Sequence, residues 1–120
     1  MDNLQAAGAS PSRALARDNE GYLLDPAAWD RTIALEIAAE EKLRLTPEHW
    51  VVIDFVREYY ETRHVVPEAR TVLKHLKQQA NGEKEKATRR YLYNLFPYGY
   101  GQQACKIAGM RKPLKLMLDV

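Results

Sequence analysis

The chain has 120 residues, of which 46% are hydrophobic and 28% are charged. A chain of this length and composition can bury one hydrophobic core, so we expect a single domain and not a disordered protein. No apolar run approaches the roughly 20 residues that cross a bilayer, and the N-terminus lacks the apolar core of a secretion signal. The single cysteine, Cys105, cannot form a disulfide within the chain, so a cytoplasmic protein without a membrane partner is expected.

The formal net charge is +2, but the two halves of the chain differ in sign. Residues 1–62 carry six Lys/Arg against twelve Asp/Glu, a net of −6, whereas residues 63–120 carry twelve against four, a net of +8. Two interpretations remain open. Either the halves pack together and their charges meet at the boundary, or the basic half presents a surface to an anionic partner, a nucleic acid or an acidic protein.

The N-terminal part contains two predicted features. Residues 1–12 are small and polar, which is typical of a disordered terminus. Residues 13–24 hold two short apolar stretches on either side of a turn in which Gly21 can adopt positive φ. They predict a small β-hairpin.

Two helix-start signals follow, each a capping residue before a proline. The signal at residues 25–26 predicts an amphipathic helix over residues 26–43, with apolar residues at i, i+4 and i+8. The signal at residues 46–47 predicts a helix over residues 47–62 that carries apolar residues on more than one face. We expect this second helix to be central.

A third helix is predicted over residues 67–79, and its outer face is basic through Arg70, Lys74 and Lys77. Residues 78–86 contain an Asn-Gly pair and a run of charges, which predict a loop.

The C-terminal part predicts two more helices and an arm. Residues 87–96 form a helical pattern that Pro97 must end. Residues 102–108 predict a short helix closed by Gly109 in a left-handed conformation. Residues 110–120 then form a C-terminal arm.

The predicted helices over residues 47–62 and 67–79 have the lengths of a helix-turn-helix unit. The second would be the recognition helix, and Arg70, Lys74 and Lys77 are candidate contacts to phosphates. Helix pairs of this kind also occur in proteins that never touch DNA, so nucleic-acid binding stays an alternative.

Cys105 is the one strong nucleophile, and its reactivity depends on formation of the thiolate. Lys106, Arg111 and Lys112 are close in sequence, and a cation near the sulfur would lower the pKa of the thiol. The alternative is a small buried apolar residue, which is the commoner role of a lone cysteine in a helix.

Other catalytic patterns are missing from the sequence. His49, His64 and His75 do not have the spacing of a metal-binding motif. No glycine-rich phosphate loop is present. We therefore expect neither a metal nor a cofactor.

Five sequence blocks lie between residues 18 and 113: Gly21-Tyr22-Leu23-Leu24-Asp25-Pro26 with Trp29, Leu45-Thr46-Pro47-Glu48-His49-Trp50, Val56-Arg57-Glu58-Tyr59-Tyr60, Tyr91-Leu92-Tyr93-Asn94-Leu95-Phe96-Pro97-Tyr98-Gly99 and Gln103-Ala104-Cys105-Lys106-Ile107-Ala108-Gly109. Together they resemble the DsrC/TusE family, and the last two blocks are the most specific.

This resemblance implies a small cytoplasmic sulfur-trafficking protein, of the kind also called the gamma subunit of dissimilatory sulfite reductase. It implies an N-terminal hairpin, a helical body and a mobile C-terminal arm. Family members carry sulfur in a relay that serves sulfur oxidation, sulfite reduction or tRNA 2-thiolation. The implied partners are sulfurtransferases of the TusBCD or DsrEFH type, sulfite reductase and heterodisulfide-reductase-like complexes.

The C-terminal arm departs from the family's pattern. In the family a penultimate cysteine takes up sulfur, and DsrC types add an upstream cysteine that pairs with it. Cys105 matches the upstream position, whereas alignment through Lys112-Pro113 places Leu116 where the sulfur-accepting cysteine should fall. The penultimate residue is Asp119, so the chain resembles a variant that lacks the penultimate cysteine.

Taken together, these features predict a mainly α protein of the α+β class, in which residues 13–109 form the domain. In the first hypothesis Cys105, if exposed, accepts and donates sulfane sulfur, and Lys106, Arg111 and Lys112 stabilise its persulfide. In the second, the chain is a carrier-deficient paralogue that acts as a regulator or adaptor, through the helix-turn-helix-like face or by occupying a partner's docking site. In the third, it is a structural subunit of a sulfur-metabolising complex.

Overall fold

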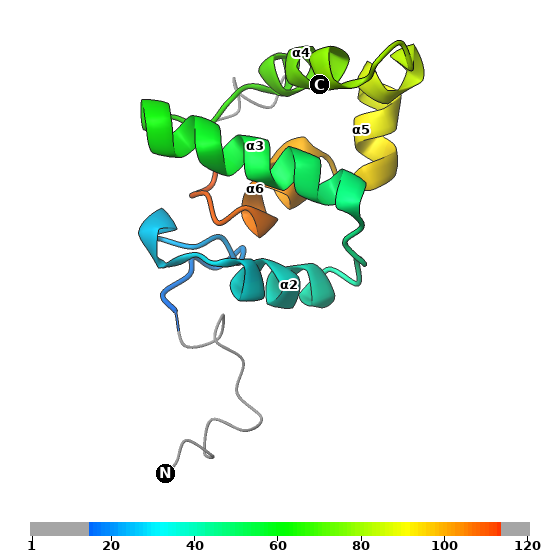
Figure 1. Cartoon of the computed structure of the whole chain (residues 1–120). Coiled ribbons are helices and arrows are strands. Elements are labelled where there is room, and N and C mark those ends of the chain that lie inside the picture. Colours follow the sequence, from blue (N-terminus) through cyan, green and yellow to red (C-terminus); the bar gives the residue numbers. More distant parts are fainter. Residues whose placement is uncertain (1–14, 114–120) are drawn as a thin grey trace.

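The computed structural model describes residues 15–113, and the regular elements in this range are helical (Figure 1). The mainly α prediction is thereby confirmed. The α-helices are α2 (Arg31–Glu40), α3 (Pro47–Arg63), α4 (Ala69–Gln79), α5 (Arg89–Leu95) and α6 (Cys105–Ile107), and the tighter or wider helices are η2 (Pro26–Ala28), η3 (Lys84–Ala87) and η4 (Tyr100–Ala104). The predicted disordered terminus and most of the predicted arm lie outside the described residues.

Helix α3 is central, as its apolar pattern predicts. In Figure 1 it runs between α2 and α4, and α6 packs against both α2 and α3. The fully buried side chains come from all of these helices and from the segment before α2, including Leu23, Ile37, Ile53, Val56, Val72, Leu92, Phe96, Tyr100 and Ile107. No helix among residues 15–113 has the length and apolar character needed to cross a membrane.

The predicted N-terminal β-hairpin is wrong for the described residues. A single antiparallel bridge joins Arg17 and Leu23, and no strand extends from it. The carboxylate of Asp18 instead organises a tight turn, because it accepts hydrogen bonds from the backbone N–H groups of Glu20 and Tyr22, both at 2.9 Å. Pairing stops soon after the bridge because η2 begins at Pro26, and a proline has no N–H to donate.

The single helix predicted over residues 26–43 is two elements. Asp25 caps η2 by accepting from the N–H of Ala27 at 3.0 Å. Trp29 is then extended, and Asp30 caps α2 by accepting from the N–H of Ile33 at 2.9 Å. The apolar spacing alone predicts one helix, but the second aspartate cap starts a new helix at this point and so divides the segment.

The next two helices lie close to their predicted bounds. His49 closes the first turn of α3, because its Nδ1 accepts from the N–H of Thr46 at 3.0 Å. Its Nε2 lies 2.7 Å from the carbonyl oxygen of Leu95, so the tautomer protonated on Nε2 satisfies both contacts. Between α3 and α4, the ring of Phe55 stacks on His75 with centroids 4.1 Å apart.

The short helix predicted over residues 102–108 begins earlier, at Tyr100, and its first part is a π-helix. The wider π-helix η4 leads directly into α6, which ends at Ile107. Gly109 then has φ +79°, as predicted for a left-handed closing residue. Its N–H donates to the carbonyl of Lys106, and the N–H of Met110 donates to that of Cys105, which is the Schellman arrangement of a helix end.

Candidate functional site

Cys105 is the first residue of α6, and its side chain has no exposed surface. Helix α6 packs against α2 and α3, so the thiol lies inside the hydrophobic core. The hydroxyl of Tyr100, which acts on the pKa of this thiol, donates to the carbonyl oxygen of Pro67. The cysteine thus occupies an enclosed position at the join between η4 and α6.

Burial raises the pKa of the Cys105 thiol to about 12, while the Tyr100 hydroxyl lowers it by a smaller amount. The neutral thiol is therefore the dominant form at pH 7, because the charged thiolate would lose its hydration. This is the opposite of the lowered pKa that the neighbouring cations suggest in the sequence. In the structure Cys105 is packed as a small buried side chain.

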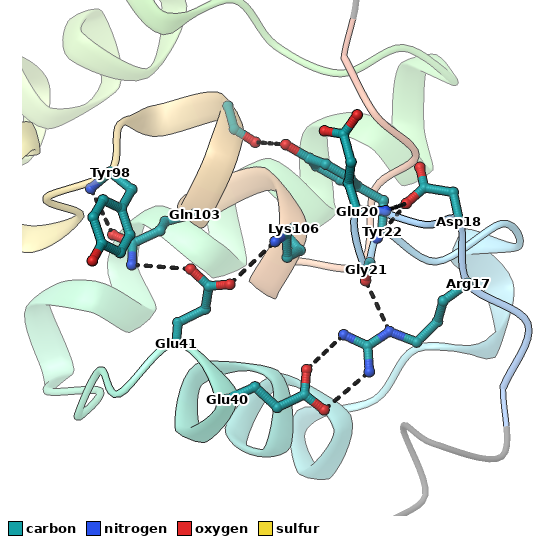
Figure 2. Close-up of polar contacts among 11 residues, drawn as sticks. Arg17, Asp18, Glu20, Gly21, Tyr22, Glu40, Glu41, Tyr98, Gln103 and Lys106 are labelled. Carbon is teal, nitrogen blue, oxygen red and sulfur yellow. Dashed lines mark hydrogen bonds and ion pairs between the residues drawn. The ribbon is translucent and has the colours of Figure 1, made fainter.

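Lys106, the nearest of those cations in sequence, is bound to a carboxylate. Its Nζ lies 3.1 Å from Oε2 of Glu41, and both side chains are largely shielded from solvent. Glu41 also accepts from the amide of Gln103, which in turn accepts from the backbone N–H of Tyr98 (Figure 2). Lys106 therefore ties α6 to the end of α2.

The other two predicted persulfide-stabilising residues follow α6. Lys112 donates to Oε2 of Glu20 at 2.6 Å, and both side chains are more than half exposed. Arg111 is exposed. Three cations that are adjacent in the sequence thus do not gather into one site: the two lysines bind separate carboxylates, and Arg111 faces solvent.

A polar cluster that the sequence reasoning missed holds the end of α6. The indole Nε1 of Trp29 donates to the carbonyl oxygen of Ile107 at 2.8 Å. Nη1 of Arg57 donates to the carbonyl oxygens of Ala108 at 3.2 Å and Pro26 at 3.0 Å. Trp29, which follows η2, and Arg57 of α3 therefore satisfy carbonyls at the start of the C-terminal arm.

Arg57 is a buried cation. Its Nη2 pairs with Glu61 at 2.8 Å, whereas its Nε has no hydrogen-bond partner. One sequence signal points to this burial, because Arg57 follows Ile53 by four residues and so lies on the apolar face of α3. Trp29 and Arg57, together with Gly109, which closes α6, form a unit that we call the α6 latch.

The predicted nucleic-acid contacts lie along α4. Arg70 pairs with Glu68 at 2.8 Å, and Lys74 and Lys77 are exposed. Helices α3 and α4 do pack together, but nothing in the comparisons below supports DNA binding by this pair.

The three histidines lie on separate parts of α3 and α4 or at their ends. His49 is buried at the start of α3, His64 follows α3, and His75 stacks on Phe55. Among residues 15–113, no three His, Cys, Asp or Glu side chains come together as a set of metal ligands.

Comparison with known proteins identifies the family. The model of the family described as "DsrC like protein" matches residues 10–117. The sulfurtransferase TusE of Pectobacterium atrosepticum is 43% identical over 103 residues, which cover 86% of this chain and 93% of that protein. The Escherichia coli sulfurtransferase TusE is 43% identical over 98 residues, covering 82% of this chain and 88% of the relative.

Solved structures give the same answer. The oxidized gamma-subunit of the dissimilatory sulfite reductase (DsrC) from Archaeoglobus fulgidus superposes with a TM-score of 0.75 at 34% identity, covering 83% of this chain and 90% of that one. The DsrC of Allochromatium vinosum superposes with a TM-score of 0.73 at 44% identity, covering 83% and 88%. The match of the family model, the relatives and the shared fold together show that the chain belongs to the DsrC-like family, which includes the TusE sulfurtransferases.

Proposed function

We propose that this chain serves a sulfur relay as a docking protein, an adaptor or regulator, and that it does not carry sulfane sulfur on Cys105. The observation that carries the proposal is the position of the thiol: the side chain of Cys105 has no exposed surface, and burial raises its pKa to about 12. Sulfane sulfur passes between proteins by attack of an accessible thiolate on a persulfide. Cys105 is neither accessible nor ionised at neutral pH.

The surroundings of the thiol support the same conclusion. A persulfide on Cys105 would add a sulfur atom to a packed core, where even one extra methylene forces neighbours to move. Lys106, which could have stabilised a persulfide anion, pairs with Glu41 instead. Cys105 therefore suits a packing role better than transfer chemistry.

The proposal retains the sulfur relay because of the family. Relatives at 43% identity are sulfurtransferases, and a related solved structure is the gamma subunit of a sulfite reductase. A chain that keeps this fold but buries its only thiol can still occupy the site on which a carrier of the family docks. Its partners would be the relay's sulfurtransferases, sulfite reductase or heterodisulfide-reductase-like complexes, within the cytoplasm.

The proposal is tested by measuring the intact mass of the protein after incubation with a persulfide-loaded sulfurtransferase. The wild type, Cys105→Ala and the E. coli TusE relative are treated in parallel. We expect the relative to gain sulfur and the wild type to keep its mass. A gain of one sulfur atom on the wild type that Cys105→Ala lacks, and that a thiol reductant reverses, would make Cys105 a carrier and overturn the proposal.

A further inference from the structure

A hollow of about 450 Å³ lies at the corner where α4 turns into η3. Its lining combines the apolar side chains of Ala80 and Ala87 with the bare backbone of Gly82, and Lys77 and Lys84 complete it. The space beside Gly82 is open, since a Cβ placed there would meet no atom within 4 Å. The result is an apolar floor with two lysines at its rim.

The charges of these two lysines are not neutralised within the described part of the chain. Lys77 and Lys84 are exposed, and neither has an ion pair among residues 15–113. Lys86 is the contrast at the same corner, because its Nζ lies 3.2 Å from Glu48 and 3.6 Å from Glu83. The rim of the hollow therefore offers positive charge to a ligand, while the neighbouring lysine is already paired.

We propose that this hollow docks an acidic segment of a protein partner, with an apolar side chain on the floor and carboxylates at Lys77 and Lys84. Opposite charges at a rim fix the orientation of a segment and speed its association. The apolar floor supplies the contact that charge alone cannot, because it removes a side chain from water. The occupant is thus recognised by an apolar centre with acidic residues on both sides of it.

A protein segment fits the hollow better than a nucleic acid does. Apart from Lys77 and Lys84 the lining is apolar side chains and the backbone of Gly82, so a phosphate backbone would find two cations and an apolar surface that phosphates do not use. None of the residues that line the hollow is aromatic, so an unpaired base has no ring to stack on. The basic half of the sequence is then a surface for an acidic protein.

This inference deepens the proposed docking role and rests on it for its biological setting. Its test uses no sulfur compound, so failure to bind an acidic segment here leaves the mass measurement of the proposed function unaffected. Sulfur uptake by Cys105 would likewise overturn the proposed function without changing the binding result.

The probe is a hexapeptide with two leucines between pairs of glutamates, titrated into the full-length, isotope-labelled protein. Backbone amide shifts in NMR spectra report where it binds. We expect the largest shifts at Ala80, Gly82 and Ala87. We also expect much weaker binding by a peptide that has serines in place of the leucines, and by a short single-stranded oligonucleotide.

Two double variants with the same change of charge distinguish specific binding at the rim of the hollow from general electrostatic attraction to the protein. Lys77→Glu with Lys84→Glu should weaken peptide binding about tenfold. Lys42→Glu with Arg44→Glu should leave it nearly unchanged, because both residues belong to the segment between α2 and α3, which leaves α2 on the side of α3 away from α4 (Figure 1).

Four results of the peptide and oligonucleotide experiments would overturn the proposal. They are amide shifts that miss the hollow, equal weakening by both double variants, equal binding of the serine peptide, and tighter binding of the oligonucleotide. Shifts at the hollow that appear on concentrating the protein alone would assign the surface to a second copy of this chain, which also overturns it.

Discussion

The guanidinium of Arg57 lies over the indole of Trp29, 4.5 Å from the ring centroid, and both side chains donate to carbonyls at the end of α6. One contact therefore joins η2, α3 and the helix that begins with Cys105. A similar pair, Arg31 over Trp50 at 3.9 Å, joins the start of α2 to α3, but there the arginine is exposed. A comparison of the two arginines therefore measures how much burial of such a pair adds to the free energy of unfolding.

Arg57→Ala should lower the free energy of unfolding by about 2–4 kcal/mol, because it removes a buried side chain that donates to the carbonyl oxygens of Pro26 and Ala108. The matched variant Arg31→Ala removes an exposed contact with both Trp50 and Asp54 and should cost at most about 1 kcal/mol. Urea unfolding of both variants checks the difference. Equal losses would mean that the α6 latch contributes no more than a surface pair.

Gly109→Ala should be more destabilising than Gly82→Ala, although both glycines have positive φ, +79° and +91°. The left-handed backbone costs any other residue about 1–2 kcal/mol at either position. At Gly109 the new Cβ would also lie 2.6 Å from Cγ of Trp29, whereas at Gly82 it meets no atom within 4 Å. Overlap in the core adds about 1–3 kcal/mol. Similar thermal midpoints for the two variants would contradict the close packing of the latch.

Cys105 should react with a thiol-specific reagent at least about a hundredfold more slowly in the folded protein than in denaturant at pH 8, because only an accessible thiolate reacts. Burial and a pKa of about 12 both oppose the reaction. Arg57→Ala should increase the rate, since loosening the end of α6 opens the route to the sulfur. Folded and unfolded rates that agree would show an exposed thiol.

Stability should fall at high pH through Cys105. The thiol has a pKa near 9.0 when unfolded and about 12 when folded, so the folded state holds its proton more tightly. The contribution is fully present below pH 9.0 and is lost as the pH rises toward 12. The destabilisation caused by Cys105→Ala, measured by urea unfolding, should therefore shrink between pH 8 and pH 10.5. A cost that stays constant over this range would contradict the raised pKa.

Several elements could be predicted because local signals suffice for them. The proline-started helix α3, the amphipathic α4 and the left-handed Gly109 each depend on residues within one or two turns. The family could also be predicted, since its blocks are dense around Cys105. The predicted hairpin was wrong, because Asp18 favours a turn and Pro26 favours a helix over strand pairing.

The site could not be predicted in the same way because it depends on contacts between distant residues. Lys106 meets Glu41 and Trp29 meets Ile107, pairs that are 65 and 78 positions apart. Sequence neighbours of Cys105 suggested a charged setting, whereas the fold surrounds the sulfur with core residues. Lys106, although adjacent along the chain, pairs with Glu41, and the thiol of Cys105 is buried in the core.

The central claim is that this protein docks in a sulfur relay but does not itself carry sulfur. It is tested most directly by competition with a sulfur-carrying relative. The rate at which the E. coli TusE relative takes up sulfur from a persulfide-loaded sulfurtransferase is measured with increasing amounts of this protein. We expect the wild type and Cys105→Ala to slow uptake equally and to remain free of sulfur. Faster uptake with the wild type alone, or no effect of either protein, would contradict the account.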